Sequence, residues 1–188
     1  MIASAVGTRN IPGSARALSS LPEVDYADRF TLATDATATP ERWARAMFGD
    51  VPNAGQLVLW RGLLGLRLSR GRSPDTVAGW LIGGRGDSWI RLTAASWLLT
   101  GNLLVQTAPG RVSLTTLIHY AGPPAALLWP PLSTVHRRLI PGVLDGAAAR
   151  VSRLGVVEGL VDGRGGAARG GWVGPQGDEI VLRTGPRG

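Results

Sequence analysis

The feature of the sequence that most constrains its fold is a series of strand-like segments between residues 76 and 120. The segments read TVAGWLI, SWIRLTAASW, LLTGNLLVQT and RVSLTTLIHY, and they are rich in Val, Ile, Leu, Thr and Trp, the residues that favour β-strands. The turn-forming stretches GGRGD and APG separate them. The pattern predicts an antiparallel meander.

Alternation along these segments predicts which side chains share a face of the sheet. In the last segment Val112, Leu114, Thr116, Ile118 and Tyr120 fall on one side, and this set is the better candidate for the core. Extending the alternation to the preceding segment predicts one face that carries six residues, which are Trp97, Leu99, Leu103, Thr116, Ile118 and Tyr120.

The stretch LSTVHRRLIPGVL follows the meander and predicts a helix that runs from near Pro130 or Pro131 to about Arg150. At about 100° per residue, one stripe of this helix carries Leu132, Val135, Leu139 and Val143. His136 lies close to this stripe, whereas the two arginines that follow it turn away. One of only two histidines in the chain is therefore expected to point inward.

The segments before the meander predict one strand and one or two helices. DYADRFTL favours a strand, and TPERWARAMFGD favours a helix capped by Thr39, with Pro40 at its first position and Gly49 at its end. Residues 54–68 fit a helix or a buried strand equally well. Residues 1–20 show no clear period and are expected to form a flexible lead-in.

At 188 residues and 44% hydrophobic composition, the chain is long enough for one well-packed domain, expected over residues 21–151. Residues 152–188 contain the glycine-rich stretch DGRGGAARGGW and predict a mostly disordered tail. The longest apolar run, AALLW, is far too short to insert into a membrane, and the N-terminus does not resemble a secretory signal. We therefore expect a cytoplasmic protein, with its oligomeric state left open.

Composition also narrows the chemistry. The chain has no Cys and only two His, which argues against a metal site, and we expect neither a metal nor a cofactor. The net charge of +7 comes entirely from Arg, in a pattern that fits a GC-rich coding sequence as well as a basic surface, and this argues against a nucleic-acid partner. The common sequence signatures of hydrolases, nucleotide-binding proteins and metalloproteases are missing.

In its order of elements, the chain resembles the helix-grip fold of START-like proteins, also called the SRPBCC superfamily. More closely, DYADRF, WARAMFGD, WLLTGNLLVQTAPGRVSLTTLIHY and HRRLIPGVL resemble a bacterial family known as domain of unknown function 2867. The resemblance covers about residues 21–150 and favours a helix over residues 54–68. It implies an α+β fold in which a curved antiparallel sheet wraps around a long C-terminal helix, with a ligand cavity between them.

Three classes of function stay open on these grounds. The leading hypothesis is a non-enzymatic protein that binds a small apolar ligand such as a lipid or polyketide. The expected ligand-binding residues are Trp97, Leu99, Leu103, Thr116, Ile118, Tyr120, His136 and Leu139. The second class is a polyketide cyclase or dehydratase in which a cavity His and Tyr act as base and acid. The third is an interaction protein that uses an Arg-rich surface. No catalytic residue is predicted.

Overall fold

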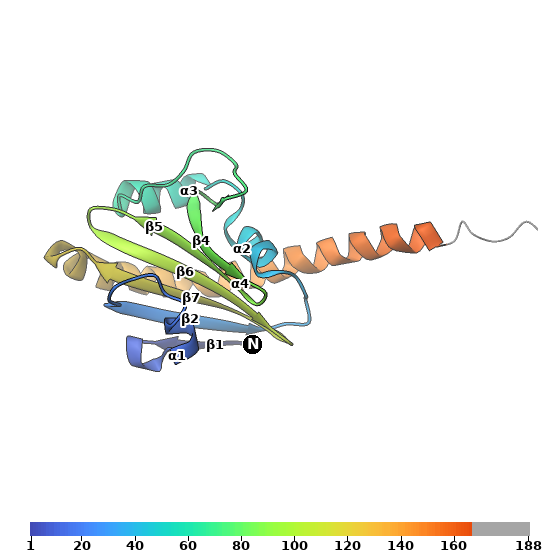
Figure 1. Ribbon diagram of the computed structural model, residues 1–188, viewed down its shortest axis with the longest axis horizontal. Coiled ribbons are helices and arrows are strands. Elements are labelled where there is room, and N and C mark those ends of the chain that lie inside the picture. Colours follow the sequence, from blue (N-terminus) through green and yellow to red (C-terminus); the bar gives the residue numbers. More distant parts are fainter. Residues whose placement is uncertain (167–188) are drawn as a thin grey trace, which may run out of the picture.

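The computed structural model describes the backbone of residues 1–166 and the side chains of residues 1–155. At its centre lies a seven-stranded antiparallel sheet with the strand order β1-β2-β7-β6-β5-β4-β3 (Figure 1). Strands β3 to β7 are neighbours in sequence order and form the predicted meander, and β2 pairs with the last of them. The strands are β1 (Ile2–Val6), β2 (Tyr26–Ala33), β3 (Thr76–Val77), β4 (Trp80–Gly86), β5 (Trp89–Ala95), β6 (Leu99–Ala108) and β7 (Arg111–Tyr120).

Helices cover one face of this sheet, which we call the inner face. The helices before the meander are α2 (Pro40–Phe48), α3 (Ala54–Leu57) and η2 (Val58–Leu63), and the long helix after it is α4 (Pro123–Gly166). Residues 54–63 are therefore helical, as the resemblance indicates, whereas residues 64–68 are not. In Figure 1 α4 crosses the sheet and extends well beyond its edge.

Helix α2 begins and ends as its sequence predicts. The side chain of Thr39 accepts a hydrogen bond from the backbone N–H of Arg42, and Pro40 occupies the first turn, where no amide hydrogen is needed. Gly49 ends the helix with a φ of 85°, in the left-handed region that glycine adopts without strain. The helix packs its apolar side against the sheet.

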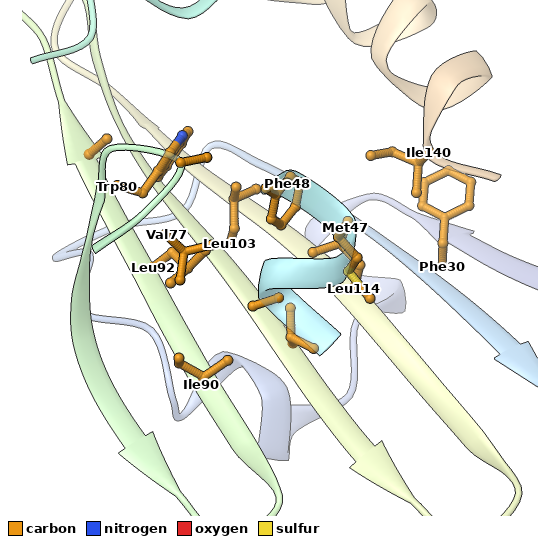
Figure 2. Packing of buried hydrophobic residues seen from close by; sticks show 14 of the residues in the cluster. Phe30, Met47, Phe48, Val77, Trp80, Ile90, Leu92, Leu103, Leu114 and Ile140 are labelled. Carbon is orange, nitrogen blue, oxygen red and sulfur yellow. The ribbon is translucent and has the colours of Figure 1, made fainter. Parts of the chain in front are cut away.

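The main core lies between the inner face and these helices. Figure 2 shows Met47 and Phe48 of α2 above Leu114 and Leu103 of the sheet, and Ile140 of α4 near Phe30 of β2. Val112, Leu114 and Ile118 are all buried in this core, which confirms the face that alternation predicts for β7.

The N-terminal residues differ from the flexible lead-in expected for residues 1–20. Ile2–Val6 pair with β2 as an edge strand, and two short helices follow, η1 (Thr8–Asn10) and α1 (Gly13–Arg16). Ile11 and Ala15 then pack against the outer face of the sheet, on Ala27, Leu104 and Leu117. The expectation was wrong because the apolar residues that cover the outer face are few and do not follow a helix or strand period.

The C-terminal helix is longer than predicted at both ends. It starts at Pro123 instead of Pro130 or Pro131, and it continues past Arg150 to Gly166. The predicted tail is therefore wrong for residues 152–166, and residues 167–188 lie outside the described part of the chain. The glycines of this region lower helix propensity, but each costs only about 1 kcal/mol, which an established helix can absorb.

The fold is thus α+β, with an antiparallel sheet packed against a long C-terminal helix, and the arrangement is helix-grip-like. The described helices include no segment that is long and apolar enough to cross a membrane.

Candidate functional site

A cavity of about 420 Å³ lies between the inner face of the sheet and α4. This volume falls within the range of small-molecule pockets, about 300–1,000 Å³. The walls are mainly aliphatic and aromatic, and come from α2, the α3–η2 segment, β4, β6, β7 and α4. The residues that give the cavity its apolar character include Phe48, Leu59, Trp60, Leu66, Trp80, Leu99, Leu103, Ile118 and Trp129.

The stripe predicted on the C-terminal helix forms one wall of this cavity. Leu132, Val135, Leu139 and Val143 all line it, together with His136. Val135 and Leu139 are also about half exposed to solvent, at 50% and 54%. A residue that faces both the cavity and the solvent marks the mouth, so the cavity opens beside α4.

The structure brings six of the eight predicted site residues to the cavity wall. These are Leu99, Leu103, Thr116, Ile118, His136 and Leu139. Tyr120 packs against the core on the same face of β7 but does not reach the cavity. Whether any of them binds a ligand stays a prediction.

The placement of Trp97 on the inner face was wrong. Trp97 lies in the turn between β5 and β6, and 72% of its surface is exposed. Alternation fails there because it holds only while the chain is extended, and β5 ends at Ala95. The Trp97 ring instead lies over Gly65, where a β-carbon would come within 3.3 Å of its indole nitrogen.

His136 is held at the cavity wall by two partners on the sheet. Its Nε2 lies 3.0 Å from the Thr116 hydroxyl and 3.3 Å from Oδ2 of Asp28. Thr116 belongs to the face predicted for β7 and to the expected ligand-binding residues. Asp28 was not predicted as a site residue, and its carboxylate is placed to orient the imidazole.

Asp28 is completely buried, and its carboxylate is only partly satisfied. Oδ2 accepts a hydrogen bond of 2.6 Å from the phenol of Tyr26, which lies two residues away on the same face of β2. Oδ1 has no hydrogen-bond partner. A buried carboxylate is costly unless it is paired, so its contacts to Tyr26 and His136 offset part of that cost.

Burial and the neighbouring carboxylate also act on Tyr26. Burial raises the pKa of the Tyr26 phenol well above its ordinary value, and the hydrogen bond and negative charge of Asp28 raise it further. The phenol therefore stays protonated at neutral pH and remains a hydrogen-bond donor to Asp28. Its ring also packs edge-on against Trp129, with centroids 5.4 Å apart.

Sequence reasoning missed Asp28 and Tyr26 although the alternation of DYADRFTL contains the signal. Tyr26, Asp28, Phe30 and Leu32 share one face of the strand, and Phe30 and Leu32 are core residues. A carboxylate on the same strand face as core residues needs a buried partner. His136 is the partner that the fold supplies, 108 positions later in the chain.

A second group of polar side chains lies outside the cavity. The group contributes three side-chain atoms of the kind that bind metal ions, all within 4.8 Å of one another, from Glu23, Asp25 and His119. The Asp25 carboxylate already accepts the Tyr120 backbone N–H at 2.7 Å and lies 3.1 Å from Nδ1 of His119. These bonds connect β7 to the residues before β2, and we assign no metal to the group.

No known protein family, no curated protein and no solved structure matches this chain. The class of protein therefore rests on the fold and the cavity alone: a helix-grip-like α+β protein with an apolar cavity between sheet and helix.

Proposed function

We propose that the protein binds a small, mainly apolar molecule in the cavity between the sheet and α4. The observation that carries this proposal is the apolar lining of a cavity of about 420 Å³ that opens at Val135 and Leu139. Transfer of apolar ligand surface from water into such a cavity is favourable, at roughly 25 cal/mol per Å². Lipids and polyketides have suitable surfaces.

A fluorescent dye tests this proposal directly. N-phenyl-1-naphthylamine is uncharged, and its emission rises in apolar surroundings. We expect saturable enhancement with the wild-type protein, because the cavity can shield the dye from water. An absence of saturable binding would contradict the proposal.

A matched pair of tryptophan variants locates the dye. Ile118 is 3% exposed and lies on the cavity floor, so the added ring volume of Ile118→Trp extends into the cavity. Leu127 is 80% exposed and lies on α4 away from the lining. We expect Ile118→Trp to abolish dye binding and Leu127→Trp to preserve it, with melting curves confirming that both variants fold.

One observation also favours the second candidate, a polyketide cyclase or dehydratase. A general base needs a group that orients it and stabilises its protonated form, and Asp28 lies in that position behind His136.

We also propose, on the order of elements alone, that the chain belongs with the START-like proteins and the domain of unknown function 2867. The helix-grip-like fold supports the superfamily, and the family comparison gives no support to the narrower assignment.

A further inference from the structure

Apart from its indole N–H groups, the lining of the cavity leaves one polar side-chain atom without a protein partner. Among the polar lining residues, the Gln56 side-chain amide accepts from the backbone N–H of Asn53 and donates to the backbone carbonyl of Phe48. The Asn102 side chain points to the outer face, where it accepts a hydrogen bond from the Ser20 N–H. The Thr116 hydroxyl bonds Nε2 of His136. The other ring nitrogen of His136, Nδ1, has no hydrogen bond within the described residues.

The partners of Nε2 decide which ring nitrogen carries the proton. Nε2 faces the Asp28 carboxylate and the Thr116 hydroxyl, and a proton on Nε2 can be donated to either. A lone pair on Nε2 would instead face a carboxylate oxygen that already accepts the Tyr26 hydrogen bond. Of the two neutral tautomers, the arrangement therefore favours the one with N–H at Nε2 and the lone pair at Nδ1.

The indole groups near the cavity do not change this balance. The N–H groups of Trp80 and Trp129 have no acceptor, but both nitrogens are enclosed by protein atoms and are not exposed to the cavity. The third indole of the lining, Trp60, can only donate through its N–H, so it does not compete with Nδ1 as an acceptor for a ligand hydroxyl. The unpaired group that the cavity offers at the His136 end is thus an acceptor.

We propose that the cavity selects apolar molecules that carry a hydroxyl group, as an alcohol, a phenol or an enol, and that this hydroxyl donates a hydrogen bond to Nδ1 of His136. The proposal rests on the proposed function, because it concerns a ligand in the same cavity. A ligand without a donor leaves Nδ1 unpaired in apolar surroundings, which is unfavourable. A ketone offers only an acceptor to this atom and is disfavoured for the same reason.

Three probes with one ring skeleton test the selection. 1-Tetralol, 1-tetralone and 1-methyltetralin place a hydroxyl, a carbonyl or a methyl group on the same carbon framework. Each is used to displace N-phenyl-1-naphthylamine from the wild-type protein. We expect the alcohol to bind about three- to tenfold more tightly than the ketone and the hydrocarbon, the difference that one hydrogen bond makes.

Variants assign the selection to His136. His136→Leu should lose the preference for the alcohol, because it removes the acceptor and keeps an apolar wall. His136→Gln keeps a polar group that can pair with Asp28 and can either donate or accept, so it should reduce the preference for alcohol over ketone even if the leucine variant does not fold. His119→Gln, which changes the other histidine of the chain, should keep the wild-type preference.

Imidazole ¹H–¹⁵N correlation spectra give a readout independent of the variants. With only two histidines, the His136 signals can be assigned by comparison with His119→Gln. A pattern of N–H at Nε2 supports the proposal, and N–H at Nδ1 overturns it. Equal displacement by all three probes, or tighter binding of the ketone, overturns the selection while leaving cavity binding intact. No binding of the dye itself overturns cavity binding as well.

Discussion

At the residue scale, the Tyr26–Asp28–His136 group combines polarity with burial. Its members come from β2 and α4 and connect the sheet to the helix across the core. A neutral hydrogen bond contributes about 0.5–1.5 kcal/mol, and one to a charged group contributes about 1.5–3 kcal/mol. The bond from Tyr26 to Asp28 is therefore expected to matter for stability as well as for the orientation of His136.

The raised pKa of Tyr26 predicts a loss of stability at alkaline pH. The unfolded phenol ionises near pH 10, whereas the folded one ionises at higher pH. The stabilisation is fully present below the unfolded pKa and disappears as the pH rises toward the folded pKa. We expect the wild-type free energy of unfolding to fall above about pH 10, and Tyr26→Phe to show a smaller fall from a lower value at neutral pH.

Urea denaturation at a series of pH values measures this dependence. Tyr120 is the only other tyrosine in the chain. Burial raises its pKa too, and the negative charge of Asp25 raises it further. Tyr120→Phe is therefore the matched control, and its stability at neutral pH should change less because it loses no bond to a buried carboxylate. An identical alkaline slope in wild type and Tyr26→Phe would contradict the prediction.

At the scale of elements, the N-cap of α2 offers a contained test. Thr39→Ala removes the side-chain acceptor for the Arg42 N–H and should cost about 1 kcal/mol in the free energy of unfolding. Thr37→Ala is the matched control, because the Thr37 side chain bonds only an exposed carbonyl of the preceding loop and caps no helix. Equal losses for the two variants in urea denaturation would show that the cap does not stabilise the helix.

A second element-scale prediction concerns the N-terminal segment on the outer face. The buried Asn102 side chain accepts hydrogen bonds from the Ser20 N–H and from the hydroxyls of Ser19 and Ser20. Asn102→Ala should lower the free energy of unfolding by about 1–3 kcal/mol, because it leaves buried polar groups unpaired.

Hydrogen exchange distinguishes a local from a global effect of Asn102→Ala. We expect faster amide exchange over residues 8–20, because the lost bonds connect this segment to the outer face of β6. Uniform acceleration of exchange throughout the sheet would instead mean that the segment and the core open as one unit.

Sequence reasoning predicted those elements whose signal is periodic. The meander and the apolar stripe of α4 follow from patterns with a fixed repeat, and the cap of α2 follows from residue types that mark helix ends. The edge strand at residues 2–6, the exposure of Trp97 and the extension of α4 to Gly166 do not, because pairing partners and turn geometry decide them. The Asp28–His136 contact joins two elements far apart in sequence, and a single sequence carries no signal of that pairing.

At the scale of the whole molecule, the end of α4 separates packed from projecting helix. Arg150 donates a hydrogen bond to the carbonyl of Ala46, and Val151 is the last buried side chain among the described residues. We predict that removal of residues 155–188 leaves a cooperative thermal transition close to that of the full chain. Removal of residues 149–188 should lower the melting temperature clearly, because it also removes both contacts.

Calorimetry of the two truncated proteins tests this prediction, with dye binding as a second measurement. If the protein that lacks only residues 155–188 no longer unfolds cooperatively, the projecting part of α4 belongs to the folding unit.

Both faces of strand β6 carry a role, and this limits where residues can be inserted or deleted in the chain during evolution. Gly101 and Leu103 line the cavity, while Asn102 between them anchors the N-terminal segment. Inserting or deleting one residue within the strand would exchange these roles for every position beyond it. Insertions are therefore expected to be tolerated in hairpin turns such as residues 109–110, so that relatives of this protein should differ in length there while β6 itself keeps a constant number of residues.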